Sequence, residues 1–248
     1  MPFDIKPWLH SMYTVSARYF ILAGVAFFIF YILFPKRFEN IKIQKKIPKS
    51  ENYYRDIRYS IIAMLIFATV GYITFTLLKP YNNINYGDIK NPYWYGLSFV
   101  WMFFLHDTYF YWCHRAMHHP FLYKKVHLIH HKSTNPSPWT AYAFHPFEAI
   151  IETGIAPLIA FTIPVHRTAF FMFMLFQILY NVYGHLGYEL FPKGFNKTRI
   201  GKYINTGTAH NQHHKYFFGN YGLYTLIWDR LLGTVREDYD ETYDSTRK

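Results

Sequence analysis

Histidine is the residue type that could do chemistry in this chain, both by number and by spacing. The sequence of 248 residues holds 14 histidines, and all but His10 lie between His106 and His214. Most fall in short groups, which read HRAMHH, HLIHH, NVYGH and HNQHH along the chain. The second and fourth groups share the pattern His-x-x-His-His. Packing alone has no use for so many imidazoles together, because a buried imidazole needs polar partners.

The spacing within these groups favours metal binding. Side chains three and four positions apart share one face of a helix, so each group presents several imidazoles side by side. Imidazole is a common metal ligand and suits Zn, Cu, Fe and Ni. A structural zinc ion takes about four ligands, so the set is too large for one ion and indicates two. The single Cys excludes a thiolate-rich site and a disulfide framework.

The identity of the metal stays open on the residues alone. A zinc hydrolase could use the same ligands, but the chain has no His-Glu-x-x-His pattern of the metalloproteases. A two-ion site at the face of a membrane, beneath apolar helices, fits iron that activates dioxygen against a lipid C–H bond.

Several apolar segments must position the histidines. The runs Arg18–Pro35 and Arg58–Leu78 are long enough to span a bilayer, which takes about 17 to 20 apolar residues. A third run, Tyr93–Cys113, contains His106 and Asp107, and ionisable residues at membrane depth usually face a functional interior. Two shorter runs, at 150–164 and 168–183, form either a tight transmembrane hairpin or two half-buried helices.

The distribution of charge predicts the orientation in the membrane. The net charge is +11, and eight basic residues lie between Lys36 and Arg58, in the loop between the first two apolar runs. Cytoplasmic loops carry an excess of Lys and Arg. If this loop is cytoplasmic, three crossings bring the chain back to the cytoplasm near His114, and all the histidine groups share that face. No nucleic-acid-binding module is present, so nucleic acid is not an expected partner.

Composition agrees with a membrane protein of helices. Hydrophobic residues make up 51% of the chain, aromatic residues 22% and charged residues 17%. These values exclude a disordered chain, a collagen-like chain and a coiled coil. We expect an all-α integral membrane bundle of about three transmembrane helices plus a helical hairpin, with a cytoplasmic histidine-rich cap. The expected division is 1–92 for the first two helices and the basic loop, 93–235 for the catalytic domain and 236–248 for a charged tail.

Four strings resemble the fatty acid hydroxylase / sterol desaturase superfamily: HDTYFYWCHRAMHHP, LYKKVHLIHH, NPSPWTAYAFHPFEAIIE and GTAHNQHHKYFFGNYGLYTLIWDRLLGT. The resemblance covers roughly Tyr93 to Thr234. It implies an integral membrane enzyme with a non-haem di-iron centre, in which zinc could substitute for iron. Carried over position by position, it implies metal-ligand roles for His114, His118 or His119, His127, His130, His131, His185, His210, His213 and His214. No catalytic residue beyond the ligands is expected.

The chain departs from the family pattern at one point and leaves some roles open. Asn181 stands where some members have a histidine, so it is a possible additional ligand, as is His145 in the segment AFHPFE. That segment is more similar to the sterol desaturase branch than to the sphingolipid fatty-acid hydroxylase branch. Metal-bound histidines commonly donate their second N–H to a carboxylate. The acids near the histidine groups that could accept are Asp107, Glu148, Glu189 and Asp229.

The resemblance implies that the protein hydroxylates or desaturates a sterol-like or fatty acyl C–H bond with dioxygen and two electrons. No fused cytochrome or flavin module is evident, so the electrons should come from a separate protein of the cytochrome or ferredoxin type. Two alternatives stay open. One is a carotenoid or ether-lipid monooxygenase on the same metal cage, and the other is a membrane metal-binding protein without redox turnover.

Overall fold

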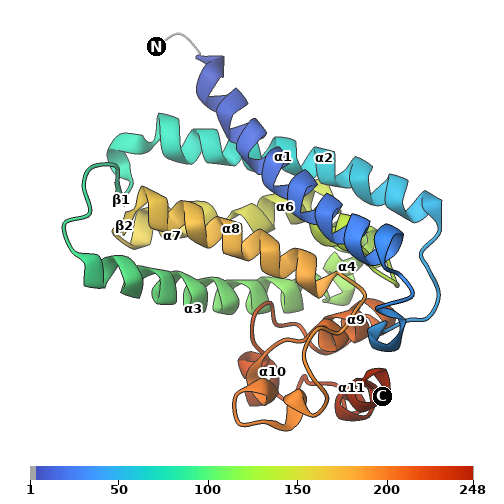
Figure 1. Ribbon diagram of the computed structural model, residues 1–248. Coiled ribbons are helices and arrows are strands. Elements are labelled where there is room, and N and C mark those ends of the chain that lie inside the picture. Colours follow the sequence, from blue (N-terminus) through green and yellow to red (C-terminus); the bar gives the residue numbers. More distant parts are fainter. Residues whose placement is uncertain (1–3, 248) are drawn as a thin grey trace.

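The computed structural model describes residues 4–247, and their fold is almost entirely helical (Figure 1). Helix α1, Ile5–Phe27, continues as a π-helix over Phe28–Leu33, and α2, Ser50–Tyr72, continues as a π-helix over Ile73–Leu77. Among the described residues, these two are long and apolar enough to cross a membrane, as the spans Ile5–Leu33 and Ser50–Leu77. Both expected N-terminal spans are therefore helices of sufficient length.

Helix α1 begins well before the apolar run that predicted it. Asp4 accepts a hydrogen bond from the backbone N–H of Lys6 and so caps the helix N-terminus. The more polar residues from Ile5 onward then form the first turns of the same helix. Tyr19 and Ala23 are fully buried on its inner face, which packs against α2.

The third apolar run forms helix α3, Pro92–Met117. Asn91 caps it by accepting a hydrogen bond from the N–H of Trp94, and Pro92 occupies the first turn, where its missing N–H costs nothing. His106 and Asp107 are buried in the middle of the helix. Helix α3 is not one of the two candidate spans, so its crossing of the membrane stays a prediction.

The two shorter apolar runs form an out-and-back pair. Helices α6, Pro146–Thr153, and α7, Ile155–Thr162, lead away from the histidine-rich end, and α8, Arg167–Gly184, returns to it (Figure 1). At the far end, strand β1, Ile84–Asn85, pairs in parallel with β2, Val165–His166. This pairing joins the loop after α2 to the turn before α8, so both loops lie at the end opposite the histidines.

Short elements build the histidine-rich end. Its helices are α4 Pro120–Val126, α5 Leu128–His131, α9 Gly207–Tyr216, α10 Ile227–Leu231 and α11 Tyr239–Thr246. Single 3₁₀ turns of this end lie at Glu39–Ile41, Pro138–Tyr142, Phe195–Lys197 and Gly201–Tyr203, and another, Lys79–Tyr81, lies at the opposite end in the loop after α2. In Figure 1 the segment after α8 forms a cap below the ends of α3 and α8.

The basic loop between α1 and α2 packs on this histidine-rich cap. The N–H of Ile43 donates to the carbonyl of Gly187 (3.0 Å), and the N–H of Glu189 donates to the carbonyl of Ile41 (2.9 Å). The amide of Gln44 donates to the side chain of Asn211 in α9 (2.9 Å). The loop and the histidine groups therefore lie on the same side of the molecule, as the charge pattern predicted.

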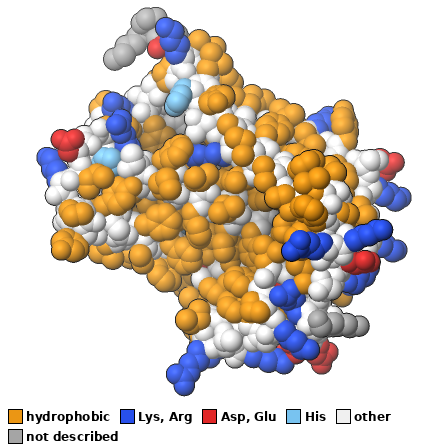
Figure 2. Space-filling view, viewed as in Figure 1, with side chains coloured by type: hydrophobic (Ala, Val, Ile, Leu, Met, Phe, Trp, Pro, Cys, Tyr) orange, Lys and Arg blue, Asp and Glu red, His pale blue; other side chains and the backbone are white. Residues whose placement is uncertain are grey.

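Broad apolar surface covers the long helices. Figure 2 shows a largely hydrophobic face over α1, α7 and α8, with most charged side chains at its margins. Large side chains exposed on these helices include Ile21, Val25, Phe28, Ile32, Phe171, Met172 and Leu179. A soluble protein rarely exposes so large a contiguous apolar area. This face suits contact with lipid.

Candidate metal centre

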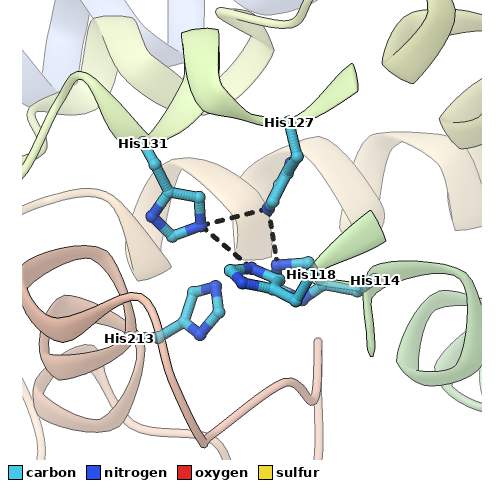
Figure 3. Close-up of side chains that lie close together, drawn as sticks. All are labelled: His114, His118, His127, His131 and His213. Carbon is cyan, nitrogen blue, oxygen red and sulfur yellow. Dashed lines mark hydrogen bonds between the residues drawn. The ribbon is translucent and has the colours of Figure 1, made fainter. Parts of the chain in front are cut away.

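Nine of the predicted histidines gather into two adjacent groups. In each group the possible ligand nitrogens all lie within 4.8 Å of one another. The first group, drawn in Figure 3, consists of His114, His118, His127, His131 and His213. The second group consists of His130, His185, His210 and His214. The two groups are close neighbours, since the rings of His131 and His214 are 4.9 Å apart between centroids.

Each His-x-x-His-His pattern divides between the two groups. Of the pattern in α5, His127 and His131 enter the first group, and His130 enters the second. In α9 the division is reversed, because His210 and His214 enter the second group and His213 enters the first. Side chains four apart stay together in both cases, and the one at the third position turns toward the neighbouring group. The sequence predicted one chelating face per segment, whereas each of these segments serves two.

Helix α9 is held in place by its own N-terminal caps. The hydroxyl of Thr206 accepts a hydrogen bond from the N–H of Ala209 (3.2 Å). The carboxylate of Glu189 accepts from both the N–H and the hydroxyl of Thr208 (2.8 Å each). An acid at a helix N-terminus also interacts favourably with the helix dipole. Glu189 therefore positions the helix that carries three of the histidines rather than touching any of them.

Backbone carbonyls fix the tautomer of four histidines. The acceptors for Nδ1–H are the carbonyls of Tyr221 for His114 (2.8 Å), Asn181 for His185 (2.7 Å), Gly219 for His213 (2.7 Å) and Ser133 for His214 (3.1 Å). A carbonyl oxygen can only accept, so each Nδ1 must carry the ring proton. A neutral imidazole has one N–H, and Nε2 of each ring is therefore left with a lone pair directed into its group.

These lone pairs require a cation. Nε2 of His185 and Nε2 of His214 lie 3.1 Å apart, although neither carries a proton. In the first group, Nε2 of His213 is buried and has no hydrogen-bond partner among the described residues. Protonation does not resolve the conflict, because burial lowers the pKa of His185 to about 4 and that of His214 well below its usual value. Metal ions bind neutral imidazole and would satisfy these nitrogens.

The nitrogen separations also match metal ligation. The Nε2 atoms of neighbouring rings are 3.0 to 3.2 Å apart within the groups, for example 3.0 Å between His114 and His127. Two imidazole nitrogens bound at about 2.1 Å to one ion, in perpendicular directions, lie about 3.0 Å apart. The residues present therefore fit one metal ion in each group.

Glu148 is the carboxylate that touches a histidine of the groups. Its Oε1 lies 2.6 Å from Nδ1 of His127, and both side chains are buried. Burial raises the pKa of Glu148 well above its ordinary value, so a negative charge there depends on nearby positive charge. Metal ions in the two groups would supply that charge, and the carboxylate would in turn orient the His127 ring.

Other predicted site residues lie outside the two groups. His119 is exposed and caps α4, where its Nδ1 accepts from the N–H of Phe121. His118, its neighbour, points into the first group. His145 caps α6 in the same way, by accepting from the N–H of Phe147. The side-chain amide of Asn181 donates a hydrogen bond to the carbonyl of Ala141 (2.7 Å). Asn181 therefore supports the structure beside His185 and is not a member of either group.

Two further acids act on the loop that follows α9. Asp107 accepts from the backbone N–H groups of Tyr224 (2.9 Å) and Thr225 (3.0 Å). Asp229 accepts from the N–H groups of Tyr221 and Gly222 (2.8 Å each). The carbonyl of Tyr221 is the acceptor for His114. Both acids therefore hold the loop that orients a ligand, one step further from the histidines than the sequence suggested.

A cavity of about 410 Å³ lies among α1, α2, α6, α7 and α8. Its walls are mainly apolar and include Phe67, Phe75, Ile155, Phe170 and Met174. Phe144 also lines it, and the Phe144 ring lies 5.1 Å from the ring of His130. Mainly apolar pockets of this size typically bind small organic molecules.

Comparison with known proteins places this geometry in a family. The family model described as "Fatty acid hydroxylase" matches residues 99–234, which is more than half of the chain and contains every histidine of the two groups. The chain belongs to the fatty acid hydroxylase family. The resemblance seen in the histidine strings is thereby confirmed.

Three curated relatives of this fatty acid hydroxylase family protein are sterol enzymes by name. A Delta(7)-sterol 5(6)-desaturase of Leptosphaeria maculans is 29% identical over 91% of this chain and 60% of its own length. A Delta(7)-sterol 5(6)-desaturase of Aspergillus fumigatus is 34% identical over 61% of this chain and 41% of its own length. The Homo sapiens lathosterol oxidase is 27% identical over 73% of this chain and 60% of its own length. The chain thus spans about half the length of these relatives. No solved structure matches it.

Some residues that shape the site in this family member left no signal in the sequence. The carbonyls that orient His185, His213 and His214 belong to backbone, and any residue type supplies a carbonyl. The cavity-lining Glu152 could have been noticed, because it follows Glu148 by four positions and so shares its face of α6. Two acids at positions i and i+4 of an apolar helix are unusual, and this pair could have been predicted to have a functional role.

Proposed function

We propose that this protein is a membrane-bound lipid oxidoreductase in which nine histidines hold two iron ions. It hydroxylates or desaturates a C–H bond of a sterol-like or fatty acyl lipid, with dioxygen and two electrons. The observation that carries the proposal is the convergence of imidazole nitrogens, with tautomers fixed by backbone carbonyls, into two groups beside an apolar cavity. The names of the relatives favour a sterol-like substrate.

Different parts of the site would have different roles in this reaction. Bound iron would supply the reduction of dioxygen and the oxidation of the C–H bond. The carbonyls of Tyr221, Asn181 and Gly219 keep the Nε2 lone pairs directed at the ions. Burial of the second group excludes water, which strengthens electrostatic interactions and suppresses side reactions. The apolar cavity beside Phe144 would hold the lipid against the second group.

Electrons would enter through the first group. His118 is half-buried, whereas every other histidine of the two groups is buried. Its ring lies beside Tyr123 (5.4 Å between centroids), near the exposed lysines Lys124 and Lys125. A separate electron-transfer protein of the cytochrome or ferredoxin type could approach this edge most closely. Basic side chains there would favour an acidic donor.

The histidine groups would face the cytoplasm. They lie on the same side as the basic loop between the two candidate spans, and Lys- and Arg-rich loops are retained on the cytoplasmic side. Labelling of a cysteine introduced at Lys46, in sealed vesicles of known orientation, tests this. Labelling from the cytoplasmic side alone is expected, and labelling from the opposite side alone would overturn the orientation.

Elemental analysis of the detergent-purified protein, with Mössbauer spectra of an iron-57 sample, is the decisive experiment. We expect about two coupled irons per chain, because each histidine group suits one ion. Products from a Delta(7)-sterol and from fatty acids, with dioxygen and a reductant, would then separate desaturation from hydroxylation. About two zincs and no iron after anaerobic reconstitution would instead support a metal-binding protein without redox turnover.

A further inference from the structure

A second acid of α6 faces the cavity instead of the metal centre. Glu152 lies four residues after Glu148, one helical turn or about 6 Å along the axis. Glu148 is the partner of His127, whereas Glu152 lines the 410 Å³ cavity. One face of a short helix therefore presents one carboxyl to the histidines and the next to the space beside them.

Among residues 4–247, the carboxyl of Glu152 has no hydrogen-bond partner. It makes no hydrogen bond and no ion pair with any residue that the structure describes. Burial raises its pKa to about 8, which favours the neutral acid. A neutral carboxyl both donates and accepts a hydrogen bond. Such a half-buried group can gain a hydrogen bond from a ligand that reaches it.

Two neighbouring hydroxyl groups already have hydrogen-bond partners. The hydroxyl of Tyr109 donates to the carbonyl of Ile151 (2.6 Å). The hydroxyl of Tyr224 pairs with Nδ1 of His106 (3.0 Å). The accessible surface that remains on Glu152 faces the cavity. The carboxyl is therefore directed to the cavity, where a polar group of a bound ligand could pair with it.

We propose that Glu152 is a substrate-binding residue that hydrogen-bonds an uncharged polar group, an alcohol, on the lipid. This inference rests on the proposed function. Because Glu152 lies one helical turn from Glu148, the partner of His127, an alcohol bound to Glu152 would lie near the histidine groups and therefore near the C–H bond that reacts. A rigid 3-hydroxysterol meets this requirement when the reacting carbons belong to the same ring system. A long-chain fatty acid, whose polar end is far from most of its methylenes, does not.

The rival ligand chemistry is an anionic lipid held by arginine. Arg18 and Arg167 also line the cavity, and the Arg18 guanidinium lies over the ring of Phe171 at 3.9 Å. A carboxylate or phosphate would pair with these cations. The neutral acid at Glu152, beside the metal centre, favours the alcohol, and the choice between them is testable.

Binding to protein loaded with zinc, which cannot turn over, separates this inference from the proposed function. The full chain is placed in nanodiscs, and the affinity of tritiated lathosterol, a 3-hydroxysterol, is compared with that of its 3-methyl ether. Glu152→Leu should weaken lathosterol binding about 10-fold, because the alcohol loses its buried partner. Glu152→Gln keeps both hydrogen-bonding functions and should bind within about 2-fold of the parent. The methyl ether can accept a hydrogen bond from the Glu152 carboxyl but cannot donate one, so Glu152→Leu should weaken its binding less than that of lathosterol.

Several results would overturn the inference. Equal weakening of both ligands by Glu152→Leu would indicate a packing role, and no weakening of either would remove Glu152 from the binding site. Tight binding of palmitate that Arg18→Gln abolishes, with lathosterol binding unaffected by either Glu152 variant, would establish the anionic ligand instead. Metal content, measured on the same samples, reports separately on the histidine groups, so a failure of the metal proposal is distinguishable.

Discussion

The two histidine groups use the same side chain in different surroundings. The first group has five members, and one of them, His118, is half-buried. The ring of His131, in the same group, is covered by Phe217, which is 40% exposed at the surface of the cap. The second group has four members, all buried, and it lies against Phe144 and the cavity.

This difference would suit the two groups to different tasks in the proposed reaction. A centre that accepts electrons from another protein needs an edge near the surface, and a centre that oxidises a lipid needs water excluded. The rings of His127 and His130 are 5.4 Å apart, so the two environments are still in contact. We infer that the first group faces the electron donor and that the second faces the substrate.

Removing one ligand from each group should have the largest effect. His130→Ala leaves the second group with three histidines, and His213→Ala leaves the first with four. We expect each variant to retain about one metal ion per chain and to lose at least about 100-fold in activity, with His130→Ala the more severe. Metal content and lipid turnover measure both effects.

A matched control for these variants is His119→Ala. His119 is a neighbour of His118 in sequence but lies outside both groups and is exposed. It should keep its metal and its activity. Full activity in His130→Ala or His213→Ala would contradict the ligand assignment, and loss of both metals in either variant would show that the groups form one inseparable unit.

The two acids of α6 give the next largest effect. Glu148→Gln removes the charge beside His127 and should lower metal affinity about 10- to 100-fold. Glu152→Gln, one turn away, should leave metal affinity unchanged because its carboxyl touches no histidine. Competition with a chelator of known affinity measures both. Equal losses in the two variants would contradict the separate roles of these acids.

The sequence predicted much of the centre and of its scaffold. The number of histidines indicated two ions, and apolar runs located α1 and α2, because both signals depend on residue type. The division of each His-x-x-His-His pattern between two groups was not predictable. It depends on how α5 and α9 face each other, which is set by packing between distant segments. Likewise the carbonyls that orient His114 and His213 carry no sequence signature.

Local capping explains why some predicted residues lie outside the groups. His119 and His145 each precede a proline that begins a helix, at Pro120 and Pro146. Such a position favours a side chain that accepts a hydrogen bond from the first turn. Both rings do so, and neither joins the two groups. The motif His-Pro at a helix start is therefore a signal for capping that the sequence already contained.

Lowering the pH should release the metal ions from the two histidine groups over a defined range. An unfolded histidine has a pKa of about 6.5, and burial lowers the pKa of His114 and of His185 to about 4. Between these values the unfolded state binds protons that the folded state does not. Each such histidine then costs up to about 1.4 kcal/mol of stability per pH unit as the pH falls. Above about pH 6.5 the contribution of these neutral histidines to the stability of the fold is fully present.

Metal content and thermal unfolding, followed from pH 8 to pH 4, measure this effect. Both should hold near neutral pH and fall together below about 6.5, because protonated imidazole cannot bind metal. Release should begin at the first group, where His118 is accessible to solvent. Metal content that stayed constant down to pH 4 would count against ligation by histidine.

Phe217 offers the finest test of the difference between the groups. It ends α9 in the left-handed conformation, with φ of 64°, and its ring lies 5.3 Å from that of His131. A non-glycine residue in this conformation costs about 1–2 kcal/mol, and glycine adopts it freely. Phe217→Ala removes the ring and keeps the backbone strain, whereas Phe217→Gly removes both.

Comparison of these two variants therefore separates the effect of covering the metal site from the effect on folding stability. Phe217→Gly should be more stable than Phe217→Ala by about 1 kcal/mol in thermal unfolding, since only the alanine keeps the strain. Both variants should release one metal to a chelator several-fold faster than the parent protein, and release of the other should not change. If both metals left faster in both variants, Phe217 would cover the whole centre, and the surface-facing first group would not be distinct from the cavity-facing second.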